Sequence, residues 1–284
     1  MFLLMVVICL LLGSFQAQSR AIERKQDIFG KSSEEIDNST EQEEKSVSAL
    51  IERANRHAGQ GLNEPPVMFG DIAVATGLEI ADPCTTRGCK WQRNKSGKVL
   101  VPYVISDGYS SQEKDVIFQG LRSFEESTCV RFMPRTNQRD YINIKSNSGC
   151  YSFVGRRTGG QTVSLDRSGC ISLNIVQHEL LHTLGFHHEH NRSDRDNHVQ
   201  ILFKNIIPGQ EYNFDKIKTN NLETAYDYSS VMHYGRQVLL QFAFSKNREP
   251  TIIPIPDNNL SIGQAEKMSS NDILRINTLY CSLS

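Results

Sequence analysis

Three histidines, a glutamate and a glycine form the pattern H-E-x-x-H-x-x-G-x-x-H, which runs from His178 to His188. His178 and His182 are four residues apart, so on a helix they point from the same face. Gly185 can end that helix, because glycine tolerates the left-handed conformation that turns the chain back and brings His188 round as a third imidazole. Three imidazole nitrogens leave the fourth position of Zn²⁺ open for water, which is typical of catalytic zinc sites. Glu179 lies beside the first ligand and can accept the proton of that water.

Two other interpretations of this stretch compete with a catalytic zinc site. Histidine-rich stretches also arise by chance or as loose metal-binding tracts, and H-E-x-x-H alone is short enough to occur by accident. The glycine and the third histidine at their fixed places argue against accident, and the full pattern resembles that of the metzincin zinc proteases. His187 and His190 fall outside the pattern, and we interpret them as residues on the surface or behind the ligands.

A second segment, Tyr226 to Gly235, contains the pattern S-x-M-H-Y. By itself it indicates an ordinary turn with a buried methionine. Together with the zinc motif it resembles the Met-turn of the astacin family of metzincins, and the run from His178 to Asp196 resembles the astacin pattern as well. The resemblance covers about 205 residues, from near Ile80 to the C-terminus.

This resemblance implies an α+β fold of two subdomains, with one zinc ion per chain at the floor of the cleft between them. It implies a zinc endopeptidase that hydrolyses protein substrates with metal-activated water. Met232 would pack under the metal. Tyr234 would be a switchable fifth zinc ligand that can swing away and donate a hydrogen bond to the tetrahedral oxyanion. Ser230 and His233 are interpreted as structural.

Hydrophobic periodicity predicts the elements that must hold these residues. Val99 to Ile105 alternates as a half-buried strand does, and Ser110 with Glu113 forms a capping box before an amphipathic helix. Further strands are expected around Tyr141 to Ile144 and Val163 to Leu165, an active-site helix from about Ser172, and a final helix over Asp272 to Leu279.

The first residues indicate export. Phe2 to Leu12 is almost entirely apolar, too short to span a bilayer and consistent with a secretory signal peptide over residues 1–17. No later apolar run reaches about 18 residues, so no transmembrane helix is expected.

Cysteine usage agrees with an oxidising compartment. Cys9 would leave with the signal peptide, and the six that remain form an even set. Six cysteines allow 15 pairings. The astacin resemblance assigns Cys129–Cys281 and Cys150–Cys170, which leaves Cys84–Cys89 as a small extra loop. A cysteine zinc site is the alternative, but the sequence has no C-x-x-C pair.

Residues 18–79 are expected to be a propeptide. The stretch Lys31 to Lys45 is polar enough to predict disorder. Val47 to Ala54 shows helical spacing, Gly59 and Gly61 would end that helix, and Pro65-Pro66 favour an extended chain.

Met68 to Ile72 then resembles the F-x-G-D latency segment of astacin precursors, with Met68 in the place of the phenylalanine. The resemblance implies that Asp71 occupies the open zinc position and displaces the water. An ordinary Gly-Asp turn is the alternative.

Charge divides unevenly along the chain. Residues 1–79 hold 7 Lys and Arg against 12 Asp and Glu, a net of −5, and residues 80–284 hold 24 against 20, a net of +4. An acidic propeptide can therefore complement a mildly basic catalytic domain over residues 80–284. A net of +4 without a basic aromatic patch gives no support for nucleic-acid binding. We expect a monomer.

Three segments narrow the resemblance to the six-cysteine astacins of fishes, a group that includes the choriolytic hatching enzymes: Ala81 to Trp91, Val101 to Ser106 and Ser148 to Ser152. This implies egg-envelope glycoproteins as substrates, storage in secretory granules and an activating protease. A digestive or peptide-processing role and a catalytically silent binding homologue are the alternatives. Two departures stand out: Glu79 replaces the usual basic residue before the mature start, and Gln237 to Phe242 resembles an insertion.

Overall fold

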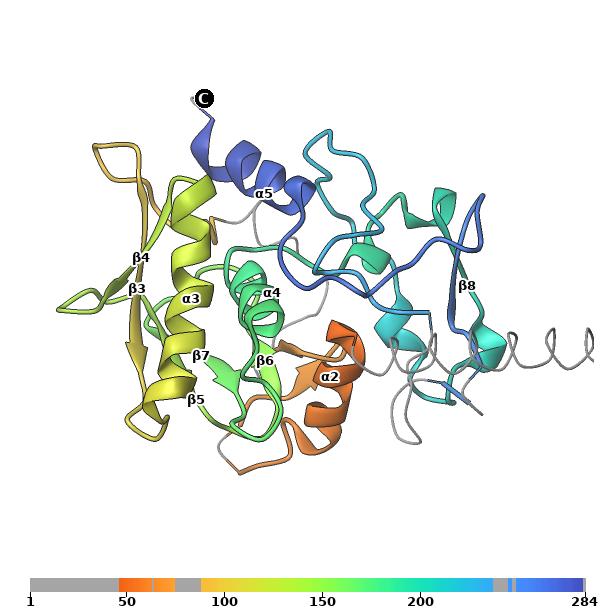
Figure 1. Cartoon of the computed structure of the whole chain (residues 1–284), viewed down its shortest axis with the longest axis horizontal. Helices are drawn as coiled ribbons and strands as arrows, with labels where there is room; N and C mark the ends of the chain where they lie inside the picture. The colour runs from red at the N-terminus through yellow and green to blue at the C-terminus, as the bar shows by residue number, and fades with distance from the viewer. Residues whose placement is uncertain (1–45, 63, 75–87, 237–244, 247–248, 283–284) are drawn as a thin grey trace, which may run out of the picture. The chain divides into compact units, whose positions relative to one another are not determined.

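The structure is a computed structural model that describes residues 46–62, 64–74, 88–236, 245–246 and 249–282 (Figure 1). The chain divides into two units, residues 1–42 and 43–284, and all described residues belong to the second. The predictions for the signal peptide, the stretch Lys31 to Lys45, the boundary at residue 80, and the segment Gln237 to Phe242 lie outside the described residues.

A seven-stranded mixed sheet with the order β1-β2-β6-β7-β5-β3-β4 forms the framework. Strands β3, β4, β5 and β7 are parallel, and β6 runs antiparallel to β7. The strands are β1 (Val67–Met68), β2 (Ile72–Ala73), β3 (Val99–Ile105), β4 (Val130–Pro134), β5 (Tyr141–Lys145), β6 (Cys150–Ser152) and β7 (Gly160–Leu165). The three predicted strands correspond to β3, β5 and β7, and β7 begins earlier than predicted because Gly160 pairs with Tyr141.

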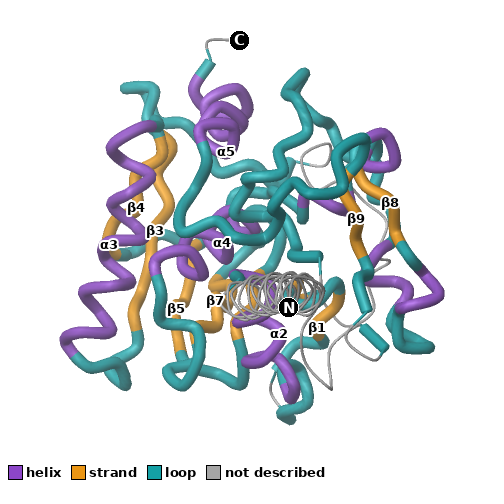
Figure 2. The backbone as a smooth tube through the Cα atoms, turned by 45° about the vertical axis from the view of Figure 1, so that its right-hand side comes forward, coloured by secondary structure: helices purple, strands orange, loops and turns teal. Residues whose placement is uncertain are grey.

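Helices α3 and α4, whose bounds follow, pack against each other beside this sheet, and α3 runs alongside β3 and β4 (Figure 2). Helix α3 (Ser111–Ser127) begins at the predicted capping box, where Ser110 Oγ accepts from Glu113 N and Glu113 Oε2 accepts from Ser110 N. Helix α4 (Leu173–Thr183) begins after Ser172, as predicted. Leu180 and Leu181 of α4 join the main buried core.

The C-terminal part has little regular structure. A two-stranded sheet, β8 (Val199–Ile201) with β9 (Ile252–Pro254), and helix α5 (Ser270–Ile276), which continues into a π-helical turn, are its main elements. Short 3₁₀ turns in this part occupy Glu189–Asn191, Arg195–Asn197, Phe203–Asn205 and Glu211–Phe214, and the π turn occupies Asn277–Cys281. Another 3₁₀ turn, Asn55–His57, lies near the N-terminal end of the described residues. A second buried cluster, which includes Phe214 and Ile252, is separate from the main core. Two cores agree with the two subdomains that the family resemblance implies.

Two disulfides have the pairing that the family resemblance implies. Cys129–Cys281 joins the start of β4 to the C-terminal turn, and Cys150–Cys170 joins β6 to the loop before α4. Cys84 lies outside the described residues, so its pairing with Cys89 stays a prediction.

The segment before residue 75 contributes to the same fold. Helix α2 (Val47–Ala54) confirms the predicted amphipathic helix, and its Val47 and Ile51 are buried in the main core. The α-helix ends at Ala54, a 3₁₀ turn continues over Asn55–His57, and Gly59 follows with a φ of 73°, so the helical run ends before the first predicted glycine. Strand β2 pairs in parallel with β6, with Ile72 opposite Ser152, a pairing that no sequence pattern indicated. Across the described residues, no helix has both the length and the apolar character that a bilayer span requires.

Candidate metal centre

Helix α4 carries two of the three predicted ligands and the predicted base on consecutive turns. His178, Glu179 and His182 are all buried. The helix ends where predicted, because Gly185 takes a φ of 101°, a conformation that glycine adopts without strain. After this turn the carbonyl of Phe186 accepts a hydrogen bond from His182 Nδ1 at 2.8 Å. The helix end is thus used to orient one of the ligands.

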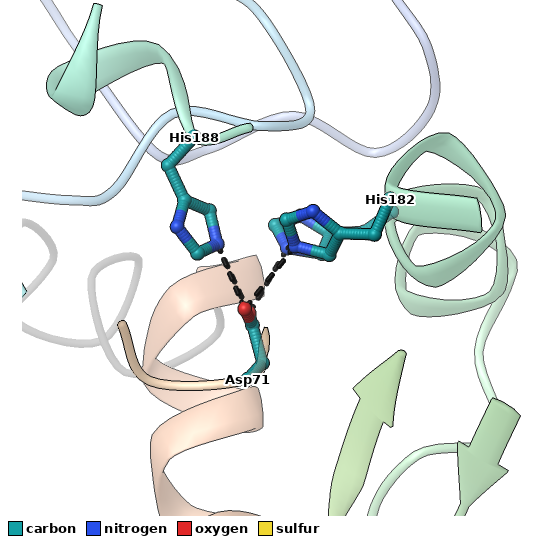
Figure 3. A group of neighbouring side chains, drawn as sticks. Asp71, His182 and His188 are labelled. Carbon is teal, nitrogen blue, oxygen red and sulfur yellow. Dashed lines mark hydrogen bonds and ion pairs between the residues drawn. The ribbon is translucent and has the colours of Figure 1, made fainter. Parts of the chain in front are cut away.

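The third histidine and an aspartate from the N-terminal segment complete the cluster. Figure 3 shows Asp71 lying between His182 and His188. The Asp71 carboxylate is 3.0 Å from His178 Nε2, 3.1 Å from His182 Nε2 and 2.9 Å from His188 Nε2. One ligand atom from each of the four residues lies within 4.8 Å of the others. Residues more than 100 positions apart in the sequence therefore meet at one point.

The donor set of this cluster fits a cation. His178 Nδ1 is 2.8 Å from Val231 O and His182 Nδ1 is 2.8 Å from Phe186 O, and a carbonyl oxygen only accepts, so both Nδ1 atoms carry the proton. The Nε2 lone pairs then face each other at 3.1 Å and also face the Asp71 carboxylate. Such a set of acceptors is stabilised by a positive ion at its centre. Imidazole nitrogens with a carboxylate oxygen are ligands that Zn²⁺ takes, so the residues fit zinc.

Electrostatics within the cluster agree with a metal centre. Burial raises the pKa of the Asp71 carboxyl, but its electrostatic interactions with His188, His182 and His178 outweigh burial and hold that pKa well below its ordinary value. Burial lowers the pKa of His182 to about 4. An ionised carboxylate beside neutral imidazoles is the protonation state in which all four residues can bind a metal.

Glu179 is a buried carboxylate whose environment suits a general base. Its side chain is buried, and neither carboxylate oxygen has a hydrogen-bond partner among the described residues. Burial raises the pKa of Glu179 well above its ordinary value, and the negative charge of Asp71 adds to this. Buried carboxylates that serve only structure are normally hydrogen-bonded, so an unpaired one beside a ligand is suited to accept a proton from water.

Tyr234 lies next to the cluster but is held by the N-terminal segment. Its hydroxyl donates to Phe69 O at 2.8 Å, and its ring lies 4.6 Å from that of His188. Burial raises the pKa of Tyr234 well above its ordinary value, so the phenol keeps its proton and can donate. His190 is buried rather than on the surface, and its ring centroid lies 4.1 Å from that of Tyr234.

The Met-turn supports the histidines through its backbone. Met232 is buried in the main core, and its carbonyl accepts from Glu189 N at 2.9 Å. Ser230 Oγ donates to Asp272, and His233 forms a hydrogen bond with the hydroxyl of Tyr226, so both have structural contacts.

Sequence reasoning missed several residues that hold this centre: Asn55, Glu189, Arg192, Asp272 and Arg275. Glu189 and Arg192 lie within the run that resembles the astacin pattern, but that resemblance gave neither residue a role. Arg192 is three residues from Glu189, whereas the other partners of Glu189, Asp227 and Arg275, lie far along the chain, so no spacing pattern marks them.

Comparison with known proteins identifies the family of this arrangement. The model of the Astacin peptidase family matches residues 86–281. The chain belongs to the astacin family. It is therefore a zinc metalloendopeptidase that acts on protein substrates, with the three histidines and Asp71 positioned for one metal ion.

Individual astacins from the fish Oryzias latipes are similar over most of the chain. The low choriolytic enzyme is 45% identical over 277 residues, which is 97% of this chain and 96% of that protein. High choriolytic enzyme 1 is 48% identical over 234 residues, 82% of this chain and 83% of that protein. The solved structure of high choriolytic enzyme 1, described as a hatching enzyme zinc-protease, superposes with a TM-score of 0.66 at 50% identity and covers 70% of this chain and 98% of that one.

Proposed function

We propose that this astacin is a hatching-type enzyme, secreted as a latent precursor, that digests egg-envelope glycoproteins. The observation that carries this proposal is the similarity to the low choriolytic enzyme, which extends over 97% of the chain. Residues 1–17 would be the signal peptide, residues 18–79 the propeptide and residues 80–284 the catalytic domain. The enzyme would act as a monomer after storage in secretory granules.

The proposed chemistry uses residues whose contacts are described above. A zinc ion bound by His178, His182 and His188 supplies a Lewis acid and lowers the pKa of water. Glu179 would take the proton of the attacking water, for which its unpaired oxygens leave it free. Tyr234 would donate a hydrogen bond to the oxyanion that develops on the scissile carbonyl. Met232 would support the ligands from below.

The proposed latency rests on two contacts of the N-terminal segment. The Asp71 carboxylate lies against all three ligand histidines, where a water would otherwise bind. Phe69 O engages the Tyr234 hydroxyl at 2.8 Å. The segment would therefore occupy the position of the nucleophilic water and engage the hydroxyl of the proposed oxyanion donor. An activating protease would cut near residue 80, although Glu79 is not the basic residue that a trypsin-like activator needs.

Asn55 is expected to reinforce this latency. Its amide donates to Gly70 O at 2.8 Å and Cys150 O at 2.7 Å, and its Oδ1 accepts from Cys150 N at 2.6 Å, so it joins α2 to the latency turn and to β6. A Cβ at Gly149 would overlap Asn55 Oδ1, so glycine is required there.

In the variant Asn55→Ala, Gly70 O and the Cys150 amide lose this partner. A buried group left unpaired costs about 1–3 kcal/mol, which corresponds to roughly 5–150-fold more of the uncovered precursor. The measurement is peptidase activity of the uncleaved precursor, with intact mass confirmed. Gln60→Ala is the control, because the Gln60 side chain is exposed and its one hydrogen bond within the described part of the chain is to Arg56 O. Equal activity of the two uncleaved precursors would show that Asn55 does not contribute to latency.

Tyr234→Phe tests the oxyanion role in the trimmed enzyme. Loss of one oxyanion donor typically lowers kcat by about 10²–10³-fold, and KM should change less because the contact forms only in the transition state. Tyr228→Phe is the matched control, since the Tyr228 hydroxyl donates to His198 O and Ile255 O outside the cluster. An effect confined to KM would exclude Tyr234 as the donor.

The substrate proposal is tested on isolated medaka egg envelopes. Activated enzyme should release soluble protein from the envelopes, and the Glu179→Gln variant should not. Casein serves as a general substrate in parallel. Cleavage of casein with intact envelopes would favour the digestive or peptide-processing role, and cleavage of neither would favour a silent binding homologue.

A further inference from the structure

Glu189, the residue after His188, is held on several sides in a buried position. Arg275 of α5 donates from both terminal nitrogens to its two oxygens, at 2.5 and 2.7 Å. The side chains of this pair are only 9% and 2% exposed. Arg192 Nη1 lies 3.3 Å from Glu189 Oε1, and Asp227 N donates to the same oxygen at 2.7 Å. A buried, bidentate arginine–carboxylate pair of this kind fixes the orientation of the carboxylate as well as neutralising its charge.

A second residue of the same helix reaches the centre by a separate route. Asp272 accepts from Ser230 Oγ at 2.6 Å and from Val231 N at 3.0 Å. The carbonyl of Val231 in turn accepts from His178 Nδ1 at 2.8 Å. Asp272 therefore reaches His178 through one intermediate residue, Val231. Arg275 reaches the backbone of His188 through one intermediate residue, Glu189.

His188 needs this support more than the other ligands do. His178 and His182 each donate from Nδ1 to a carbonyl, which fixes their rings. His188 Nδ1 has no hydrogen-bond partner among the described residues. Its ring packs against the rings of Tyr234 and His190, but no hydrogen bond on Nδ1 fixes it, so its position depends on the backbone that carries it. Glu189 anchors that backbone through its side chain and through its own N–H, which donates to Met232 O at 2.9 Å.

We propose that helix α5 is the positioning element of the zinc centre. Arg275 fixes the backbone of His188 through Glu189, and Asp272 fixes the ring of His178 through Val231 O. Neither residue touches the metal position. The inference rests on the zinc assignment and not on any particular substrate. Groups that orient metal ligands in this way typically change metal affinity by about 10–100-fold when they are removed.

The first test is the rate at which the zinc-loaded precursor loses its metal to excess EDTA, followed with a zinc indicator. Arg275→Gln should lose zinc about 10–100-fold faster than the wild type. Arg275→Lys keeps the charge but not the two-pronged contact, so its rate should be intermediate. Arg275→Lys also keeps the test decisive if the glutamine variant does not fold. Asp272→Asn tests the second route, and an unchanged rate there would overturn that route.

Ile276→Ala is the matched control on the same helix. Ile276 is fully buried in the main core, so this variant loses packing but removes none of the side-chain hydrogen bonds that hold Glu189 and Val231. It should lower the thermal midpoint and leave the rate of zinc loss near that of the wild type. If the Arg275 variants behave like Ile276→Ala, α5 contributes packing alone and the proposal is wrong. If the wild-type precursor binds no zinc, the zinc assignment itself fails, which is a distinguishable result.

Discussion

Glu179→Gln is expected to give a folded, zinc-binding protein whose peptidase activity is lower by about 10²–10⁴-fold. A carboxamide keeps the size of the side chain but cannot accept a proton from water at neutral pH. Because both oxygens of Glu179 lack partners among the described residues, the substitution removes no structural hydrogen bond seen there, and the fold should be unaffected. The measurements are casein cleavage by the trimmed enzyme and zinc content by metal analysis.

Glu113→Gln provides the comparison for that experiment. Glu113 caps α3 and pairs with Arg167 far from the histidines, so its loss should leave the rate per folded molecule near that of the wild type. Near wild-type cleavage by Glu179→Gln would show that another group accepts the proton. A variant that lost its zinc would show that Glu179 helps to hold the metal.

Asp71→Ala is expected to give a precursor with measurable activity before any cleavage. The substitution removes a carboxylate that contacts all three histidines, so water can enter. Activation should be partial, because Phe69 O still engages Tyr234 and β2 still pairs with β6. The assay is peptidase activity of the uncleaved precursor, with intact mass verified before and after.

Glu64→Ala is the matched control for Asp71→Ala. Glu64 is also an acidic residue of the N-terminal segment, and its Oε1 accepts from Ser148 N away from the histidines. This variant should be far less active than Asp71→Ala, because it loosens one contact of the segment but keeps the carboxylate on the histidines. If Asp71→Ala is no more active than Glu64→Ala yet becomes fully active once trimmed near residue 80, the segment blocks the site sterically and the carboxylate is dispensable.

The sequence predicted the parts of this site that depend on local spacing. His178 and His182 share a helix face, Gly185 ends that helix, and Ser110 caps α3, because each of these follows from residues within one or two turns of each other. Asp71 was implied by a short motif rather than by spacing. Strand β4 alternates only at Val130 and Phe132 and β6 is only three residues long, so neither strand has the longer periodic pattern that marks β3.

The contacts that hold the site were beyond sequence reasoning. The pair of Glu189 with Arg275 joins residues 86 positions apart, and the contact of Asn55 with Cys150 joins residues 95 apart. Such pairs leave no periodic trace, because any buried glutamate can be neutralised by an arginine from any neighbouring element. Only the packing of α5 and α2 decides which partner is present.

The order of elements along the chain has a consequence for biosynthesis. Helix α2 and strands β1 and β2 precede the histidines, and α5 follows them. A ribosome makes the chain from its N-terminus, so Asp71 has emerged before the first zinc ligand is synthesised. The helix that holds Glu189 and Val231 emerges last. The metal centre can therefore be completed only when its covering segment is already at hand, so a newly made chain need not pass through an uncovered, proteolytically competent state.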